Sequence, residues 1–193
     1  MNEIQLIRSQ LTAERQRAGA IANACVSALQ RAEAEALPGG PALGEFRQAC
    51  VDYLVCVLAW FEERDQRLAD LARSRLGPDD PARRTLQEVL ARPGRSREAL
   101  EKLEAASAAG SAPSGAAAPA SWQEFAHHLA SVWGTRRDEL DALLALNPRV
   151  ADWRSVAGID ADSILEERQR YARVSALLPA GASLTAPPAP GAG

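Results

Sequence analysis

Residues 3–41 read EIQLIRSQLTAERQRAGAIANACVSALQRAEAEALPGGP, a long run of helix-forming residues that ends in four turn-forming ones. Alanine, leucine, glutamate, glutamine and arginine predominate in the run, and these residue types favour helices. Its apolar residues recur at steps of three and four, which keeps one side of a helix apolar. Because proline and glycine end helices, the sequence predicts a first helix over residues 3–37 and a tight turn directly after it.

The same periodicity recurs in three later segments. Helices are expected over residues 43–76, 121–146 and 161–178, each followed by a proline within two residues. No segment shows the sustained alternation of apolar and polar residues that is typical of a strand. The sequence therefore predicts an all-α protein, an up-down-up-down four-helix bundle.

A short helical insertion is predicted between the second and third helices, over residues 77–106. Asp80-Pro81 is a favourable start for a helix, and Pro93-Gly94 is expected to interrupt it. We therefore expect either a short αα-hairpin or an extension beyond the bundle.

Two segments are predicted to lie outside the packed helices. Residues 107–121 contain only alanine, glycine, serine and proline, which is typical of a flexible linker. Residues 179–193 have a similar composition and are expected to form a disordered tail. Residues 1–178 then make up one helical domain.

The composition excludes several classes of protein. The chain has 193 residues, 47% of them hydrophobic, and a net charge of −3, which favours neither a disordered chain nor a nucleic-acid partner. No apolar run approaches the roughly 18 residues of a membrane span, so no membrane partner is expected. The polar N-terminus is unlike a signal peptide, and we expect a cytoplasmic protein.

Cysteine and histidine offer few ligands for a metal. Cys25, Cys50 and Cys56 have no CxxC spacing and fall in apolar helical stretches, so they are interpreted as buried free thiols. His127 and His128 are adjacent, and neighbouring helical residues point about 100° apart. Glu124 and His127 match a Glu-x-x-His pattern once, and we interpret this as a chance match on an exposed face.

One charged residue interrupts the apolar stripe of each predicted helix: Glu14, Asp65, Arg136 and Glu167. Counting residues from the turns places the four at about the same height along the helices. Glu14 also begins a Glu-Arg-Gln-Arg string that recurs at Glu167, so arginines flank both glutamates. The sequence therefore predicts one polar layer across the bundle.

This layer has two interpretations. Glu14, Asp65 and Glu167 could hold non-haem iron or manganese, as carboxylates do in other bundle cores. Alternatively, Arg136 neutralises the acids in a buried ion-pair network, and no cofactor is bound. A guanidinium where a cation would sit repels a metal, so Arg136 favours the network. A third alternative is that Glu14 or Asp65 lies at the surface, because turning a helix by one position would move it there.

The helix order, the segment Phe61–Leu68 (FEERDQRL) and the third helix over Phe125–Leu144 resemble the hemerythrin-like four-helix bundles. That family holds a di-iron centre with a His-x-x-x-Glu motif on the second helix and a His-x-x-x-His motif on the third. Neither motif is present here, and Val132 stands four residues after His128. The resemblance therefore implies the fold and argues against oxygen carriage.

The expected function is that of a non-catalytic protein. The sequence contains no constellation of nucleophile and base and no phosphate-binding glycine loop. We expect a helical bundle that binds a protein partner or a small ligand, or that forms a homodimer. The alternative is a carboxylate-rich metal protein that serves as a sensor or an oxidoreductase.

Overall fold

The computed structural model describes residues 2–35, 41–80, 82–109, 117–134, 149–158 and 160–184. Every regular element in these ranges is an α-helix, which confirms the all-α prediction. The helices are α1 (Glu3–Ala34), α2 (Pro41–Arg75), α3 (Ala82–Ala109), α4 (Ala117–Gly134), α6 (Val150–Ala157) and α7 (Ala161–Ala176). None of these described helices has the length and apolar character needed to cross a membrane.

Side-chain caps fix the first residues of two helices. The Asn2 side chain accepts a hydrogen bond from the Gln5 backbone N–H (2.9 Å), and the Asn2 N–H donates to the Gln5 side chain (3.2 Å). This reciprocal pair is a capping box. Asp160 caps α7 through the Ser163 N–H (2.8 Å). These caps satisfy backbone donors that have no partner within their own helix.

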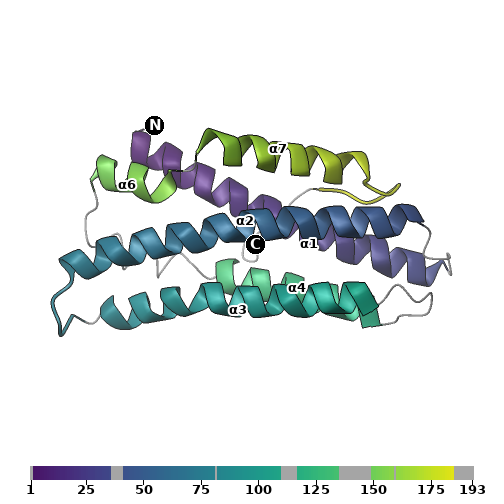
Figure 1. The fold of residues 1–193 in the computed structure, drawn as a ribbon, viewed down its shortest axis with the longest axis horizontal. Helices are drawn as coiled ribbons and strands as arrows, with labels where there is room; N and C mark the ends of the chain where they lie inside the picture. Colours follow the sequence, from purple (N-terminus) through teal and green to yellow (C-terminus); the bar gives the residue numbers. More distant parts are fainter. Residues whose placement is uncertain are drawn as a thin grey trace, which may run out of the picture.

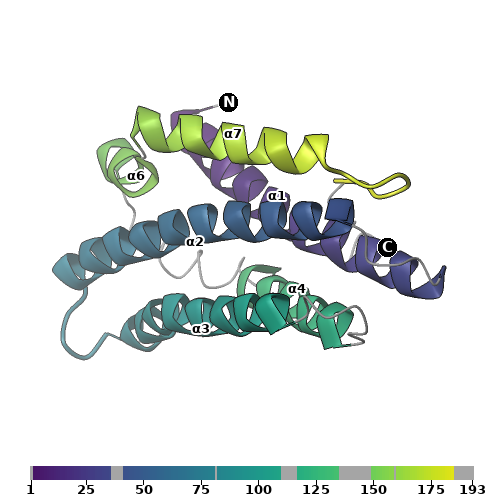
Figure 2. The ribbon, with the colours of Figure 1, turned by 45° about the vertical axis from the view of Figure 1, so that its right-hand side comes forward.

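The helices lie in three layers (Figure 2). α2 lies in the middle, with α6 and α7 on one side and α3 and α4 on the other, and α1 crosses obliquely from the side of α7 to that of α4. α1 packs against α2 and α4, and α3 packs against α2 and α4. α7 packs along α2, while α6 contacts both α1 and α2 (Figure 1).

The main core lies between these layers and draws on five helices. Its largest fully buried side chains are Trp122, Tyr53, Phe46, Ile21 and Leu54. Leu100 and Leu103 of α3 and Val174 of α7 belong to the same cluster. Burying each such apolar side chain contributes on the order of 2 kcal/mol, so this core is the main source of stability.

The predicted interruption at Pro93-Gly94 is wrong, because α3 runs unbroken through both residues. A proline inside a helix costs about 3 kcal/mol through the lost hydrogen bond and a steric clash. Leu86, Leu100 and Leu103 of α3 are nevertheless all buried. Tertiary packing on both sides of Pro93 therefore outweighs its local preference. The segment is one long helix in the outer layer, not a short hairpin.

Helices α3 and α4 extend into the predicted linker from both sides, and the predicted tail begins later than expected. α3 continues to Ala109 and α4 begins at Ala117, inside the predicted linker of residues 107–121. Alanine is the best helix former, and in both places it extends a helix that packing already holds. Residues 110–116 lie outside the described part of the chain.

The first residues of the predicted tail are held in place. Arg31 donates hydrogen bonds to the carbonyl oxygens of Ala180 (2.6 Å) and Gly181 (3.0 Å), and Leu184 packs against the main core. Gly181 has a φ of +78°, a conformation that glycine adopts without strain. A disordered tail from residue 179 onward is therefore wrong for residues 179–184.

Candidate functional site

The structure places three of the four predicted layer residues. Asp65 on α2 and Glu167 on α7 are buried, at 4% and 6% exposure, and Glu14 on α1 is partly buried. Neither Glu14 nor Asp65 is at the surface, so the alternative of a turned helix is wrong for both. Arg136 lies outside the described residues.

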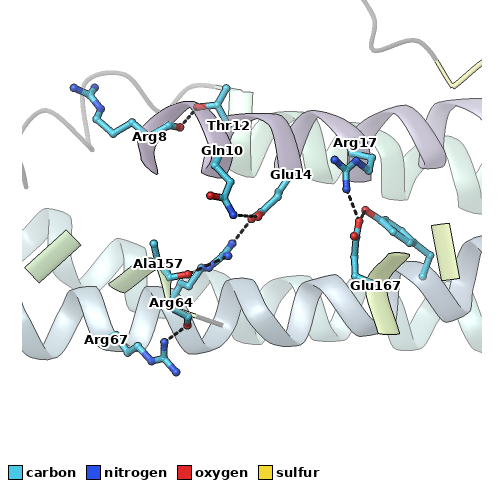
Figure 3. Close-up of polar contacts among 11 residues, drawn as sticks. Arg8, Gln10, Thr12, Glu14, Arg17, Arg64, Arg67, Ala157 and Glu167 are labelled. Atoms are coloured by element: carbon cyan, nitrogen blue, oxygen red, sulfur yellow. Dashed lines mark hydrogen bonds and ion pairs between the residues drawn. The ribbon is translucent and has the colours of Figure 1, made fainter. Parts of the chain in front are cut away.

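Glu14 forms the first polar cluster, together with Arg64 of α2 and the end of α6. Arg64 Nη1 donates to Glu14 Oε2, and the two side chains are only 4% and 15% exposed. Arg64 Nη2 donates to the carbonyl oxygen of Ala157 (3.3 Å), the last residue of α6. Because a helix C-terminus carries partial negative charge, this contact favours the cation as well. The cluster joins α1, α2 and α6 (Figure 3).

Arg67 adds a second attachment of α2 to α6. One turn beyond Arg64, its Nη1 donates to the carbonyl oxygen of Ser155 (3.2 Å) and to that of Gly158. Its Nη2 also donates to Glu63, four residues earlier on α2. Two arginines of α2 therefore bind the C-terminal turn of α6.

Glu167 forms the second polar cluster, with partners from α1 and α2. Its Oε1 accepts hydrogen bonds from Arg17 Nη1 (2.6 Å) and from the Tyr53 hydroxyl (2.9 Å). Figure 3 shows this pair and the Glu14–Arg64 pair as separate contacts along α1. The two glutamates thus belong to two clusters, each with its own arginine.

Aromatic rings surround this second cluster. The Arg17 guanidinium carbon lies 5.1 Å from the centroid of the Tyr171 ring, within the range of a cation–π contact. The Tyr53 and Tyr171 rings lie 6.0 Å apart at 60°. Burial and then the neighbouring Glu167 carboxylate raise the pKa of the Tyr53 hydroxyl far above its ordinary value. The hydroxyl therefore stays protonated and acts as a hydrogen-bond donor.

The sequence predicted the carboxylates but missed three of their partners: Arg64, Arg17 and Tyr53. Both arginines lie in the charged strings around the predicted acids: Arg17 is three residues after Glu14, and Arg64 directly precedes Asp65. A helical neighbour at i+3 lies close to the same face, so the string at Glu14 already carried a usable signal. The sequence around Tyr53 gave no such signal, because tyrosine is common in the apolar stripe of a helix.

The two histidines lie apart from both clusters, on α4. Glu124 and His127 are exposed, which agrees with a chance match to the Glu-x-x-His pattern. His128 Nε2 lies 3.2 Å from the Oγ of Ser96, a buried residue of α3. Burial, and then the charge of Arg95, lower the pKa of His128. This pair joins α3 to α4.

Within the described ranges, no group of three or more histidine, cysteine, aspartate or glutamate side chains is placed to hold a metal ion. The oxygens of Glu14 and Glu167 instead face guanidinium groups. A carboxylate in contact with an arginine is a poor metal ligand, because the cation competes for the same lone pairs. Chemically, each cluster can stabilise an interhelix contact.

Comparison with family models, with curated proteins and with solved structures finds no match to this chain. The resemblance to the hemerythrin-like bundles therefore stays a prediction.

Proposed function

We propose that this chain is a non-catalytic, cytoplasmic helical-bundle protein that acts by binding a protein partner or a small ligand. Its polar clusters serve to fasten helices together. One observation carries the proposal: Glu14 and Glu167 are each bound by an arginine from another helix. Groups that would have to serve as metal ligands or as acid–base catalysts are thus engaged in structural contacts.

The bundle in this proposal consists of α1, α2, α3 and α4. Each packs against two of the others, in the closed order α1, α2, α3, α4. All four contribute buried side chains to one core, which supports a four-helix arrangement. α7 then occupies an outer position on α2, and the fourth member of the bundle is α3 in place of the segment 161–178.

The polar clusters offer little to a catalyst. A general base needs a free lone pair within reach of its substrate. Glu167 is 6% exposed and accepts two hydrogen bonds at one oxygen, while Tyr53 is held as a donor. The cytoplasmic part of the proposal is supported by three free cysteines, which are typical of reducing compartments.

Partner binding is supported by three large apolar side chains at the surface. Leu6 on α1, Val55 on α2 and Leu165 on α7 are 57%, 41% and 55% exposed. They lie on three different helices, and we propose that they are contact points for a protein partner. Sedimentation of the parent and of Leu165→Ser over a range of concentrations tests whether the partner is a second copy.

The decisive experiment is metal analysis of protein purified without chelators. We expect no stoichiometric iron or manganese, and no change in melting temperature when either ion is added. Glu167→Gln is the matched control, because it keeps the shape and removes the charge. About two metal ions per chain would overturn the proposal, as would stabilisation by manganese that the control lacks.

A further inference from the structure

Cys25 and Cys50 occupy equivalent places on two adjoining helices. Cys25 lies nine residues before the end of α1 at Ala34, and Cys50 lies nine residues after the start of α2 at Pro41. α1 ends and α2 begins at the same end of the molecule (Figure 1). Because both helices rise 1.5 Å per residue, the two cysteines stand at the same height.

The two thiols lie in the same part of the core. Both residues are 0% exposed and belong to the same apolar cluster, and Cys50 is among the neighbours that raise the pKa of the Cys25 thiol. Buried alanines flank them, among them Ala22, Ala28 and Ala49. Small side chains let two helices approach closely, as a link between Cys25 and Cys50 requires.

Cys56 differs from this pair in its surroundings. It is partly exposed, and the charges that act on its thiol come from Glu166 and Arg170 of α7. All three cysteines are free thiols in the structure. Cys25 and Cys50 therefore form one facing pair, and Cys56 belongs to another part of the surface of α2.

We propose that Cys25 and Cys50 are an oxidation site, at which a low-molecular-weight disulfide such as oxidised glutathione converts the two thiols into one interhelix disulfide. One cysteine attacks oxidised glutathione, which forms a mixed disulfide and releases one reduced glutathione. The other cysteine then attacks the protein sulfur of that mixed disulfide and releases the second glutathione. The two thiol protons end on the two glutathione molecules, so the exchange is balanced.

Burial makes this site slow to react and selective. It raises the pKa of the Cys25 thiol, so little of the reactive thiolate is present in the closed core. Reaction therefore requires the α1–α2 pair to open locally. Once formed, the disulfide closes the loop between Cys25 and Cys50 and restricts the unfolded chain. The oxidised protein is then more stable than the reduced one.

The test uses the full chain with Cys56→Ser, which leaves only the facing pair. The folded protein is incubated with oxidised glutathione, with and without urea below the unfolding transition. We expect the intact mass to fall by two hydrogen atoms and a peptide map to join Cys25 to Cys50. We also expect the melting temperature to rise and to return when a reductant is added. Urea should accelerate the reaction.

A control variant and the possible results of the peptide map distinguish the proposed disulfide from other reactions. Adding Cys25→Ala to the test variant leaves one thiol, which cannot lose two hydrogens. The same peptide map on the parent chain replaces the variant if Cys56→Ser does not fold. Two thiols that stay open to alkylation, a lasting glutathione adduct on either cysteine, or a link from Cys50 to Cys56 would each overturn the proposal.

Discussion

Arg17 and Glu167 lie 150 residues apart in the sequence, yet the guanidinium donates to the carboxylate across 2.6 Å. The contact fixes α7 against α1. Tyr53 of α2 donates to the same carboxylate oxygen, so one buried glutamate joins three helices. Removing it affects two donors at once.

Glu167→Ala should destabilise the protein by about 3 kcal/mol, because it leaves the buried Tyr53 hydroxyl without its acceptor and Arg17 without its anion. Arg17→Ala should cost only about 1 kcal/mol, because Tyr53 still donates to Glu167 and because water can replace a side chain that is itself 38% exposed. Urea unfolding of both variants measures the difference. Equal losses would show that Glu167 contributes nothing beyond its pair with Arg17.

Arg64→Met should cost about 3–5 kcal/mol, because it leaves the poorly exposed Glu14 carboxylate without a cation. Glu14→Leu combined with Arg64→Met should recover much of that loss, since the remaining charge is then removed as well. A double-mutant cycle by urea unfolding gives the coupling energy. If the loss in the double variant equals the sum of the losses in Glu14→Leu and in Arg64→Met, the two residues are not energetically coupled.

Acid should weaken the contact between α3 and α4 through His128. Burial lowers the pKa of His128 in the folded protein below the ordinary 6.5, so the folded state binds fewer protons than the unfolded state. Its contribution to stability is therefore complete above pH 6.5 and is lost as the pH falls from there toward the folded pKa. His128→Gln should flatten this part of the stability curve, whereas His127→Gln, at an exposed position, should leave it intact. Identical curves for the two variants would contradict the prediction.

Gly181→Ala should break the hydrogen bonds from Arg31 to the carbonyl oxygens of Ala180 and Gly181. A Cβ at Gly181 would clash with Arg31 Nη1, and the φ of +78° disfavours other residues. We expect a loss of about 1 kcal/mol in thermal or urea unfolding. Gly77→Ala is the matched control, because nothing lies within 4 Å of a Cβ there. A smaller loss at Gly181 than at Gly77 would show that the Arg31 contact is unimportant.

The extent of α1, α2 and α7 could be predicted because local signals agree with packing in those helices. The apolar stripe of α1 and the Asp160 cap of α7 are both readable in the sequence. α3 could not be predicted as one helix, because Pro93 signals a break locally. Only the burial of Leu86 and Leu103 by other helices reveals why the helix continues.

The sequence could predict the acidic residues of the candidate site, but it could not predict which residues pair with them. A charge in an apolar stripe shows that Glu14 and Glu167 face inward, but periodicity gives no information about which neighbour reaches them. Arg64 meets Glu14 only because α2 lies beside α1 at that height. Long side chains such as arginine extend across helix boundaries, so their partners depend on the tertiary arrangement.

The way in which α6 is bound to α2 determines which substitutions the two helices can tolerate. Arg64 and Arg67 bind backbone carbonyl oxygens of Ser155 and Ala157, which every residue type possesses. Substitutions at positions 155 and 157 therefore leave the acceptors in place, whereas a change at position 64 or 67 removes a donor to them. Relatives of this chain should accordingly vary at positions 155 and 157 and keep arginine at both positions of α2.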